Sequence, residues 1–132
     1  WDFQWLLPAT WSGAMSVAVL NLNNMRDHIS DATAGKNTIV VRMGFAWSRR
    51  YHLVLFLVGW LSWWAYALVL HAGEWRGMGW IAVLNAVHFA HVFRVFNAEN
   101  PQELDPELKR VALSSAVAAL FFLMAQTGLV AP

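Results

Sequence analysis

The sequence predicts an all-α, polytopic transmembrane helical bundle. Of its 132 residues, 58% are hydrophobic and 13% are charged, whereas ordinary soluble domains have about 25% charged residues. Four stretches lack Asp, Glu, Lys and Arg, and each is long enough to cross a bilayer as a helix: residues 3–25, 51–73, 77–93 and 111–132. Burying four such segments would leave a soluble protein of this size too few polar residues to cover its surface. The composition therefore argues against a water-soluble globule.

The first expected span covers about residues 8–27. It begins at Pro8, which a first helical turn tolerates, and small residues such as Gly13 and Ser16 permit close helix contact. Gly35 is the expected stop after this helix. A motif loop is expected between this span and the next, over residues 28–46. Within it we expect residues 36–44 to form an ordered loop, because the β-branched run at 38–41 would have no pairing partner as a strand at a membrane surface.

The remaining spans are expected at about residues 47–70, 78–97 and 107–129, with an acidic, proline-containing connector at 97–106. The segments 26–50 and 94–110 hold five and three of the nine basic residues. The positive-inside rule therefore predicts that these two segments are cytoplasmic, and that the turn at 71–77 and both chain ends face outward. There is no cysteine, which excludes disulfides and thiolate metal sites.

The N-terminal residues do not resemble a signal peptide. They include no initiator Met, no basic segment and no small-residue cleavage site. We therefore expect this chain to be part of a longer polypeptide.

Residues 23–44, called the polar cassette below, are the most informative part of the chain. Asn23, Asp27 and Asp31 recur every four residues, so they share one face if the first helix continues through them. Lys36 and Arg42 follow closely. Acids can hold a hard divalent cation and bases can hold phosphate oxygens, so the cassette predicts a site for a metal-bridged diphosphate. The alternatives are simple pairing of these acids and bases at the headgroup level, and attraction of the bases to anionic lipid.

A second set of polar residues lies inside the third span. Asn85, His88 and His91 recur every three residues and predict a polar stripe that faces the bundle interior. Interhelical hydrogen bonding or lining of a substrate pocket is favoured over a zinc site, because no third ligand is evident.

Four polar residues open the second span. Arg49 and Arg50 are interpreted as topology determinants, and Tyr51 and His52 as headgroup-level anchors, with contact to a substrate as the alternative.

Four segments of the polar cassette form a recognisable pattern: Asn-Asn-Met-Arg-Asp at 23–27, Asp31, Gly-Lys-Asn-Thr at 35–38 and Val-Arg-Met-Gly at 41–44. The pattern closely resembles the second aspartate-rich motif of the UbiA-type intramembrane prenyltransferases, in the variant of the branch that prenylates 1,4-dihydroxy-2-naphthoate for menaquinone. The segment Ser-Arg-Arg-Tyr-His at 48–52 resembles the start of the next helix in the enzymes of the same branch.

This resemblance implies a multi-pass bundle of about nine spans in the inner (cytoplasmic) membrane, with two aspartate-rich motifs that face each other on the cytoplasmic side. The first motif has no counterpart in this sequence, so the upstream half of the same enzyme is an expected partner. We expect the present segment alone to transfer no prenyl group.

The resemblance also implies the chemistry. A polyprenyl diphosphate would react with the aromatic acceptor, with loss of carbon dioxide, to give a demethylmenaquinone. Mg²⁺ is the implied cofactor. The residues implied for the metal are Asn23, Asp27 and Asp31. Those implied for the diphosphate are Asn24, Arg26, Lys36 and Arg42, of which Lys36 and Arg42 would neutralise the leaving group. Those implied for the acceptor or tail pocket are Asn85, His88 and Tyr51.

Other functions remain open at this point. Another aromatic acceptor, such as 4-hydroxybenzoate, is the nearest alternative, although the opening of the motif at 23–27 argues against it. A non-catalytic, lipid-binding scaffold of four spans would bind diphosphate without regard to magnesium. An ion transporter using His88 and His91 would need an acidic relay within the spans. No nucleic-acid partner is expected.

Overall fold

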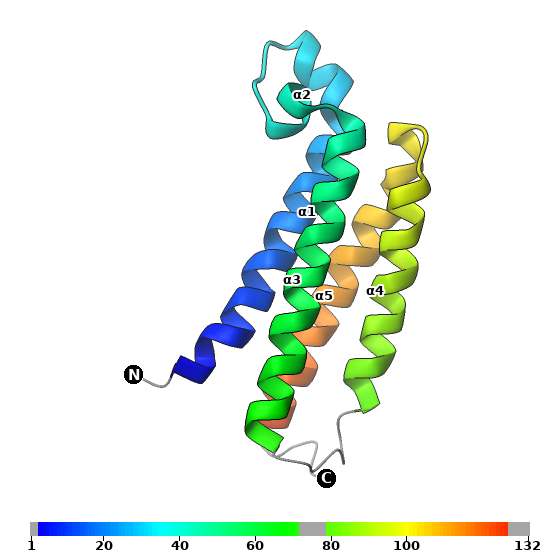
Figure 1. Ribbon diagram of the computed structural model, residues 1–132. Helices are drawn as coiled ribbons and strands as arrows, with labels where there is room; N and C mark the ends of the chain where they lie inside the picture. Colours follow the sequence, from blue (N-terminus) through cyan, green and yellow to red (C-terminus); the bar gives the residue numbers. More distant parts are fainter. Residues whose placement is uncertain (1–2, 72–78, 127–132) are drawn as a thin grey trace.

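The computed structural model describes residues 3–71 and 79–126, which form helices with no strand. A 3₁₀ turn, η1 (Phe3–Trp5), leads into α1 (Leu6–Thr33), which is followed by the short α2 (Ile39–Met43) and by α3 (Phe45–His71). The second half contains α4 (Gly79–Asn97), the 3₁₀ turn η2 (Pro101–Leu104) and α5 (Asp105–Gln126). The four long helices pack as a bundle (Figure 1), which confirms the all-α prediction.

Three of these helices are long and apolar enough to cross a membrane, over Phe45–Val69, Gly79–Asn97 and Pro101–Gln126. They correspond to the second, third and fourth predicted spans. The predicted first span is also helical, within α1, but α1 is not among the three. Uncharged polar residues such as Ser12, Ser16 and Asn21 lie along it, and its charged residues lie near its C-terminal end. The turn expected at 71–77 lies almost wholly outside the described residues, as do both chain ends and the last residues of the fourth span.

The loop predicted over residues 28–46 is wrong for most of its length. Helix α1 continues to Thr33, and Gly35, at φ 72°, follows it in a left-handed conformation that suits glycine, as the sequence indicated. Residues 39–43 then form α2, and α3 begins at Phe45. The side chain of Thr38 caps α2 by accepting a hydrogen bond from the backbone of Val41 at 3.2 Å, and Val40 is buried. Capping and burial therefore override the β-propensity of this run.

Helix α1 packs along α3 and also touches α5, while α4 lies against both α3 and α5. Tryptophans pair across the α1–α3 contact, with the rings of Trp11 and Trp63 centred 4.4 Å apart. Gly59 allows the two helices to approach closely, because a Cβ atom there would lie 2.8 Å from the terminal methyl of Met15. The contact holds α1 firmly against the rest of the bundle.

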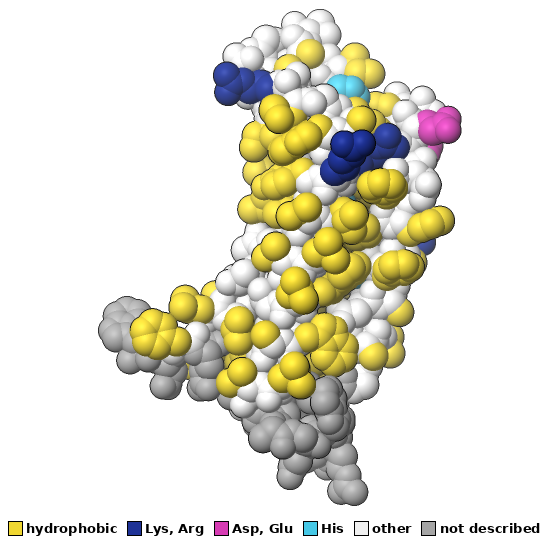
Figure 2. Space-filling view, viewed as in Figure 1, with side chains coloured by type: hydrophobic (Ala, Val, Ile, Leu, Met, Phe, Trp, Pro, Cys, Tyr) yellow, Lys and Arg dark blue, Asp and Glu magenta, His cyan; other side chains and the backbone are white. Residues whose placement is uncertain are grey.

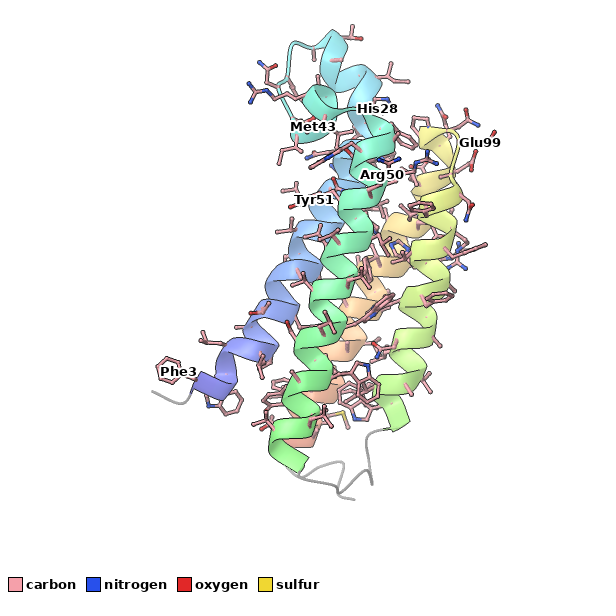
Figure 3. All side chains as sticks on the ribbon, viewed as in Figure 1. Phe3, His28, Met43, Arg50, Tyr51 and Glu99 are labelled. Atoms are coloured by element: carbon pink, nitrogen blue, oxygen red, sulfur yellow. The ribbon has the colours of Figure 1, made fainter. Side chains whose placement is uncertain are left out.

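The polar connectors gather at one end of the bundle. Helix α2 and the turn η2 lie at the same end (Figure 1), in agreement with the prediction that these two connectors share one side of the membrane. On the face shown in Figure 2, hydrophobic side chains cover most of the length of the bundle, and the basic and acidic side chains lie mainly towards this end. His28, Met43, Arg50 and Glu99 lie there too, with Phe3 at the opposite end (Figure 3).

Candidate functional site

The acidic face of the polar cassette is continuous, because α1 runs through Asn23, Asp27 and Asp31. This meets the condition under which the sequence places the three side chains on one face. Arg26 forms a bidentate pair with Asp27: its Nε donates to Oδ1 at 2.8 Å and its Nη2 donates to Oδ2 at 2.8 Å. The same Nη2 donates to Oδ1 of Asn23 at 3.0 Å. One guanidinium therefore occupies the oxygen atoms of the first two residues of this face.

The third acid is paired with the loop that follows. The Nζ atom of Lys36 donates to Oδ1 of Asp31 at 2.7 Å, and the backbone N–H of Lys36 donates to the Asp31 carbonyl at 2.9 Å. The Asp31 side chain is 7% exposed, whereas that of Lys36 is 64% exposed. The hydrogen bond to Asp31 and the charge of that carboxylate raise the pKa of Lys36, and Asp27 adds to the effect. Lys36 thus lies between a nearly buried acid and solvent.

The structure does not bring Arg42 and Asn24 into this paired cluster. Arg42 is exposed in the last turn of α2, and Asn24 is half-buried on α1. Within residues 3–71 and 79–126, neither side chain forms a hydrogen bond or an ion pair. Both are therefore available to a ligand that reaches this end of the bundle.

The donor set of the acidic face fits Mg²⁺. It offers two carboxylates and one amide, all of them oxygen donors, and Mg²⁺ commonly binds one or two carboxylates together with water and substrate phosphates. No cluster of three or more His, Cys, Asp or Glu suited to a metal occurs in the described part of the chain. The face therefore fits a metal that a second set of ligands completes, rather than a full protein cage.

The polar stripe of the third span faces the interior, as predicted. His88 and His91 are each 1% exposed. His88 hydrogen-bonds Oγ of Ser114 at 3.0 Å through its Nε2, and His91 hydrogen-bonds Oε2 of Glu107 at 2.7 Å through its Nδ1. These bonds join α4 to α5, so they support the interhelical interpretation over a zinc site.

Asn85 is half-buried and faces two spaces. It lines a cavity of about 10 Å³ beside His88, and an open groove of about 500 Å³ with Trp60, Trp64 and other apolar residues of α3 and α4. The predicted pocket residue Tyr51 lies elsewhere, stacked on Trp47 with ring centroids 5.3 Å apart. The three predicted pocket residues therefore do not form one site in this part of the protein.

A buried polar network joins three helices and was missed by the sequence analysis. The Nε2 atoms of His52 and His91 lie 3.0 Å apart, and Glu107, which is 2% exposed, also accepts from Nε of Arg94 at 2.6 Å and from Arg110. The prediction that His52 is a headgroup anchor is wrong. Since α3 starts at Phe45, residue 52 faces the core, and His52 is 0% exposed.

Arg49 has a structural role beyond topology. Its Nη1 donates to the carbonyl oxygens of Phe96 and Ala98, each at 2.8 Å, and its guanidinium lies 5.5 Å from the centre of the Phe45 ring. It therefore satisfies carbonyls at the C-terminal end of α4, where a positive charge is also favourable.

Residues 1–116 match the UbiA prenyltransferase family. The chain belongs to this family. With three apolar helices, this UbiA member is a multi-pass membrane protein. No solved structure matches it.

Several curated relatives are named 1,4-dihydroxy-2-naphthoate octaprenyltransferase. The protein from Haemophilus influenzae is 36% identical over 92% of the chain, that from Escherichia coli 35% identical over 90%, and that from Mycobacterium tuberculosis 36% identical over 90%. The matched region is 39%, 38% and 39% of these relatives. The chain thus spans about two fifths of the length of the curated UbiA relatives that it matches.

Proposed function

We propose that this chain is the part of a UbiA-family enzyme that carries the second aspartate-rich motif, and that the complete enzyme prenylates 1,4-dihydroxy-2-naphthoate. The observation that carries the proposal is the helical face on which Asp27 and Asp31 lie four residues apart, with Lys36 bound to Asp31. The names of the curated relatives support the choice of acceptor.

In this proposal the acidic face binds the diphosphate through Mg²⁺. Asn23, Asp27 and Asp31 would hold the metal, which would supply positive charge to the diphosphate oxygens. Lys36 and Arg42 donate to those oxygens directly and stabilise the charge that develops on the leaving group, and Asn24 and Arg26 contribute further donors. Lys36 is well placed for this role because its ammonium is exposed while its partner Asp31 is nearly buried.

The reaction proposed at this site breaks the bond between the allylic carbon and the diphosphate oxygen, and the electron pair leaves with the diphosphate. The ring carbon that bears the carboxylate attacks the allylic cation. Loss of that carboxylate as carbon dioxide returns its electron pair to the ring and gives the hydroquinone, demethylmenaquinol, whose oxidation to the quinone is a separate step. The bilayer keeps water away from the cation, and the groove lined by Asn85, Trp60 and Trp64 is a candidate surface for the apolar tail.

The complete enzyme is proposed to lie in the cytoplasmic membrane with the polar cassette on the cytoplasmic side. The rest of the polypeptide is proposed to supply the first aspartate-rich motif and the remaining metal ligands. Two features support this arrangement: the described part of the cassette offers only a partial ligand set, and the matched region covers 39% and 38% of two of the relatives.

The test is Mg²⁺-dependent transfer from a radiolabelled polyprenyl diphosphate to 1,4-dihydroxy-2-naphthoate, using membranes that contain the full-length protein. Wild type is compared with Asp31→Asn and with Glu99→Gln, which removes a negative charge at the same end of the bundle but away from the cassette. We expect product from wild type and Glu99→Gln and a loss of about 100-fold or more in Asp31→Asn at equal protein level.

Equal product in wild type and Asp31→Asn would exclude Asp31 from the metal site. A parallel reaction with 4-hydroxybenzoate tests the other acceptor. The non-catalytic scaffold would be favoured if neither acceptor gives product and if the affinity for pyrophosphate is the same with and without Mg²⁺.

A further inference from the structure

The two acids of the cassette hold their counter-ions differently. Arg26 engages Asp27 while both side chains are partly open to solvent, at 31% and 34% exposure. Asp31, by contrast, is 7% exposed beneath Lys36. Because Arg26 uses both oxygens of Asp27 and the oxygen of Asn23, a metal ion that binds these atoms would compete with the guanidinium for them.

A second acid lies within reach of the same guanidinium. Oδ1 of Asp105 is 3.8 Å from Nε of Arg26. Asp105 is the first residue of α5, and η2, which precedes it, packs against α1. Its side chain is 62% exposed and forms no hydrogen bond among the described residues, so its oxygens are free to accept a closer contact.

We propose that Asp105 is a positioning residue for the metal–diphosphate site and accepts the guanidinium of Arg26 when Asp27 and Asn23 bind the metal. The inference rests on the proposed function. A divalent cation at Asp27 repels a guanidinium that stays beside it. A small rotation towards Asp105 separates the two positive groups and keeps Arg26 paired, close enough to donate to a diphosphate oxygen.

The experiment uses the full-length protein in detergent micelles and measures Mn²⁺ binding in the presence of inorganic pyrophosphate by electron paramagnetic resonance. The variants are Asp105→Asn, Arg26→Gln, the double variant, and Glu99→Gln as the charge-matched control. The side chain of Glu99 forms no hydrogen bond or ion pair within the described residues. Prenyl transfer is measured on the same samples.

We expect Asp105→Asn to weaken Mn²⁺ binding about two- to fivefold, the size of an exposed ion-pair effect, and to raise the Mg²⁺ concentration for half-maximal transfer by a similar factor. Glu99→Gln should bind as wild type does. In the Arg26→Gln background, Asp105→Asn should have no further effect, because there is no guanidinium to accept. Asp105→Glu, which keeps the charge, should restore the wild-type affinity and guards against a loss of folding.

Wild-type affinity in Asp105→Asn, or an equal loss with and without Arg26, would overturn this inference while leaving the proposed function intact. If wild type itself neither binds Mn²⁺ with pyrophosphate nor transfers a prenyl group, the proposed function is overturned, and this inference with it.

Discussion

At the scale of single residues, Lys36 has the most direct link between environment and expected chemistry. Its ammonium donates to Asp31 at 2.7 Å, and this contact raises its pKa above the usual 10.5. A raised lysine pKa means that the pairing is complete below the usual value and is lost only as the pH rises through the raised one. Lys36 is therefore positively charged throughout the neutral range.

This predicts how the pH dependence of diphosphate binding changes in Lys36→His. An unperturbed histidine loses its charge near a pH of about 6.5. The KM for polyprenyl diphosphate should therefore rise about tenfold between roughly pH 6 and pH 8 in the variant, and no such rise should come from Lys36 in wild type. Steady-state kinetics of the full-length protein over this range provide the measurement. Parallel pH profiles for the two proteins would contradict a role for this charge.

The residues of the acidic face could be predicted from sequence because their spacing of four is a property of one helix. The ion pairs that these acids form could not be fully predicted from sequence, since Arg26 and Lys36 could each have reached either acid. His52 and Glu107 could not be predicted, because their burial depends on the mutual register of α3, α4 and α5. A charged residue three positions from a base, as Glu107 is from Arg110, is far more common on an exposed helix face.

At the scale of elements, α2 is the feature that places Arg42, the last base of the cassette. It is only five residues long, too short to be stable as an isolated helix. The cap from Thr38 and the burial of Val40 stabilise it, and Gly44, at φ 86°, ends it. The order of this segment therefore depends on a few specific contacts.

Thr38→Ala should loosen α2 without unfolding the bundle. Loss of an N-cap costs about 1 kcal/mol, which corresponds to roughly fivefold faster amide exchange in residues 39–43. Hydrogen–deuterium exchange with mass spectrometry measures this change. Thr33→Ala is the matched control, because its hydroxyl bonds a carbonyl within α1 at 2.9 Å and does not cap α2. Equal acceleration in the two variants would show that the cap does not stabilise α2.

The long helices were predictable because an uncharged apolar stretch specifies a span by its length alone. The short α2 was not, because its valines and isoleucine favour strands and its stability comes from the cap and from contacts with α1 and α3. The start of α3 at Phe45 was predicted to within two residues, at about Trp47.

At the scale of the whole molecule, the buried network is what holds α3, α4 and α5 together at the cassette end. Glu107 is 2% exposed and is shared among His91, Arg94 and Arg110. Glu107→Gln should therefore lower the free energy of unfolding by about 2 kcal/mol, a moderate value because both arginines are about half exposed and can turn to solvent. Thermal unfolding in detergent is the measurement. Lys109→Gln, on an exposed neighbour, should have little effect, and a similar loss in both variants would contradict the prediction.

The orientation of the bundle in the membrane is a second prediction at this scale. The sequence contains no cysteine, so single cysteines can be placed freely within it. In a full-length protein without other accessible cysteines, Ser30→Cys should react with a membrane-impermeant maleimide only after the cells are opened. Phe3→Cys, at the opposite end of the bundle, should react in intact cells. The reverse pattern would place the cassette outside.

The polar cassette carries its own counter-ions, and this affects how a substrate reaches it. Residues 23–44 contain two acids and three bases, and both acids are already paired. The field that extends from this surface into solution is consequently weak, so a diphosphate receives little long-range attraction and its rate of arrival should change little with ionic strength. Under the proposed function, selectivity would then arise after the encounter, when Arg26 exchanges its partner, and would be expressed in how long a substrate stays bound.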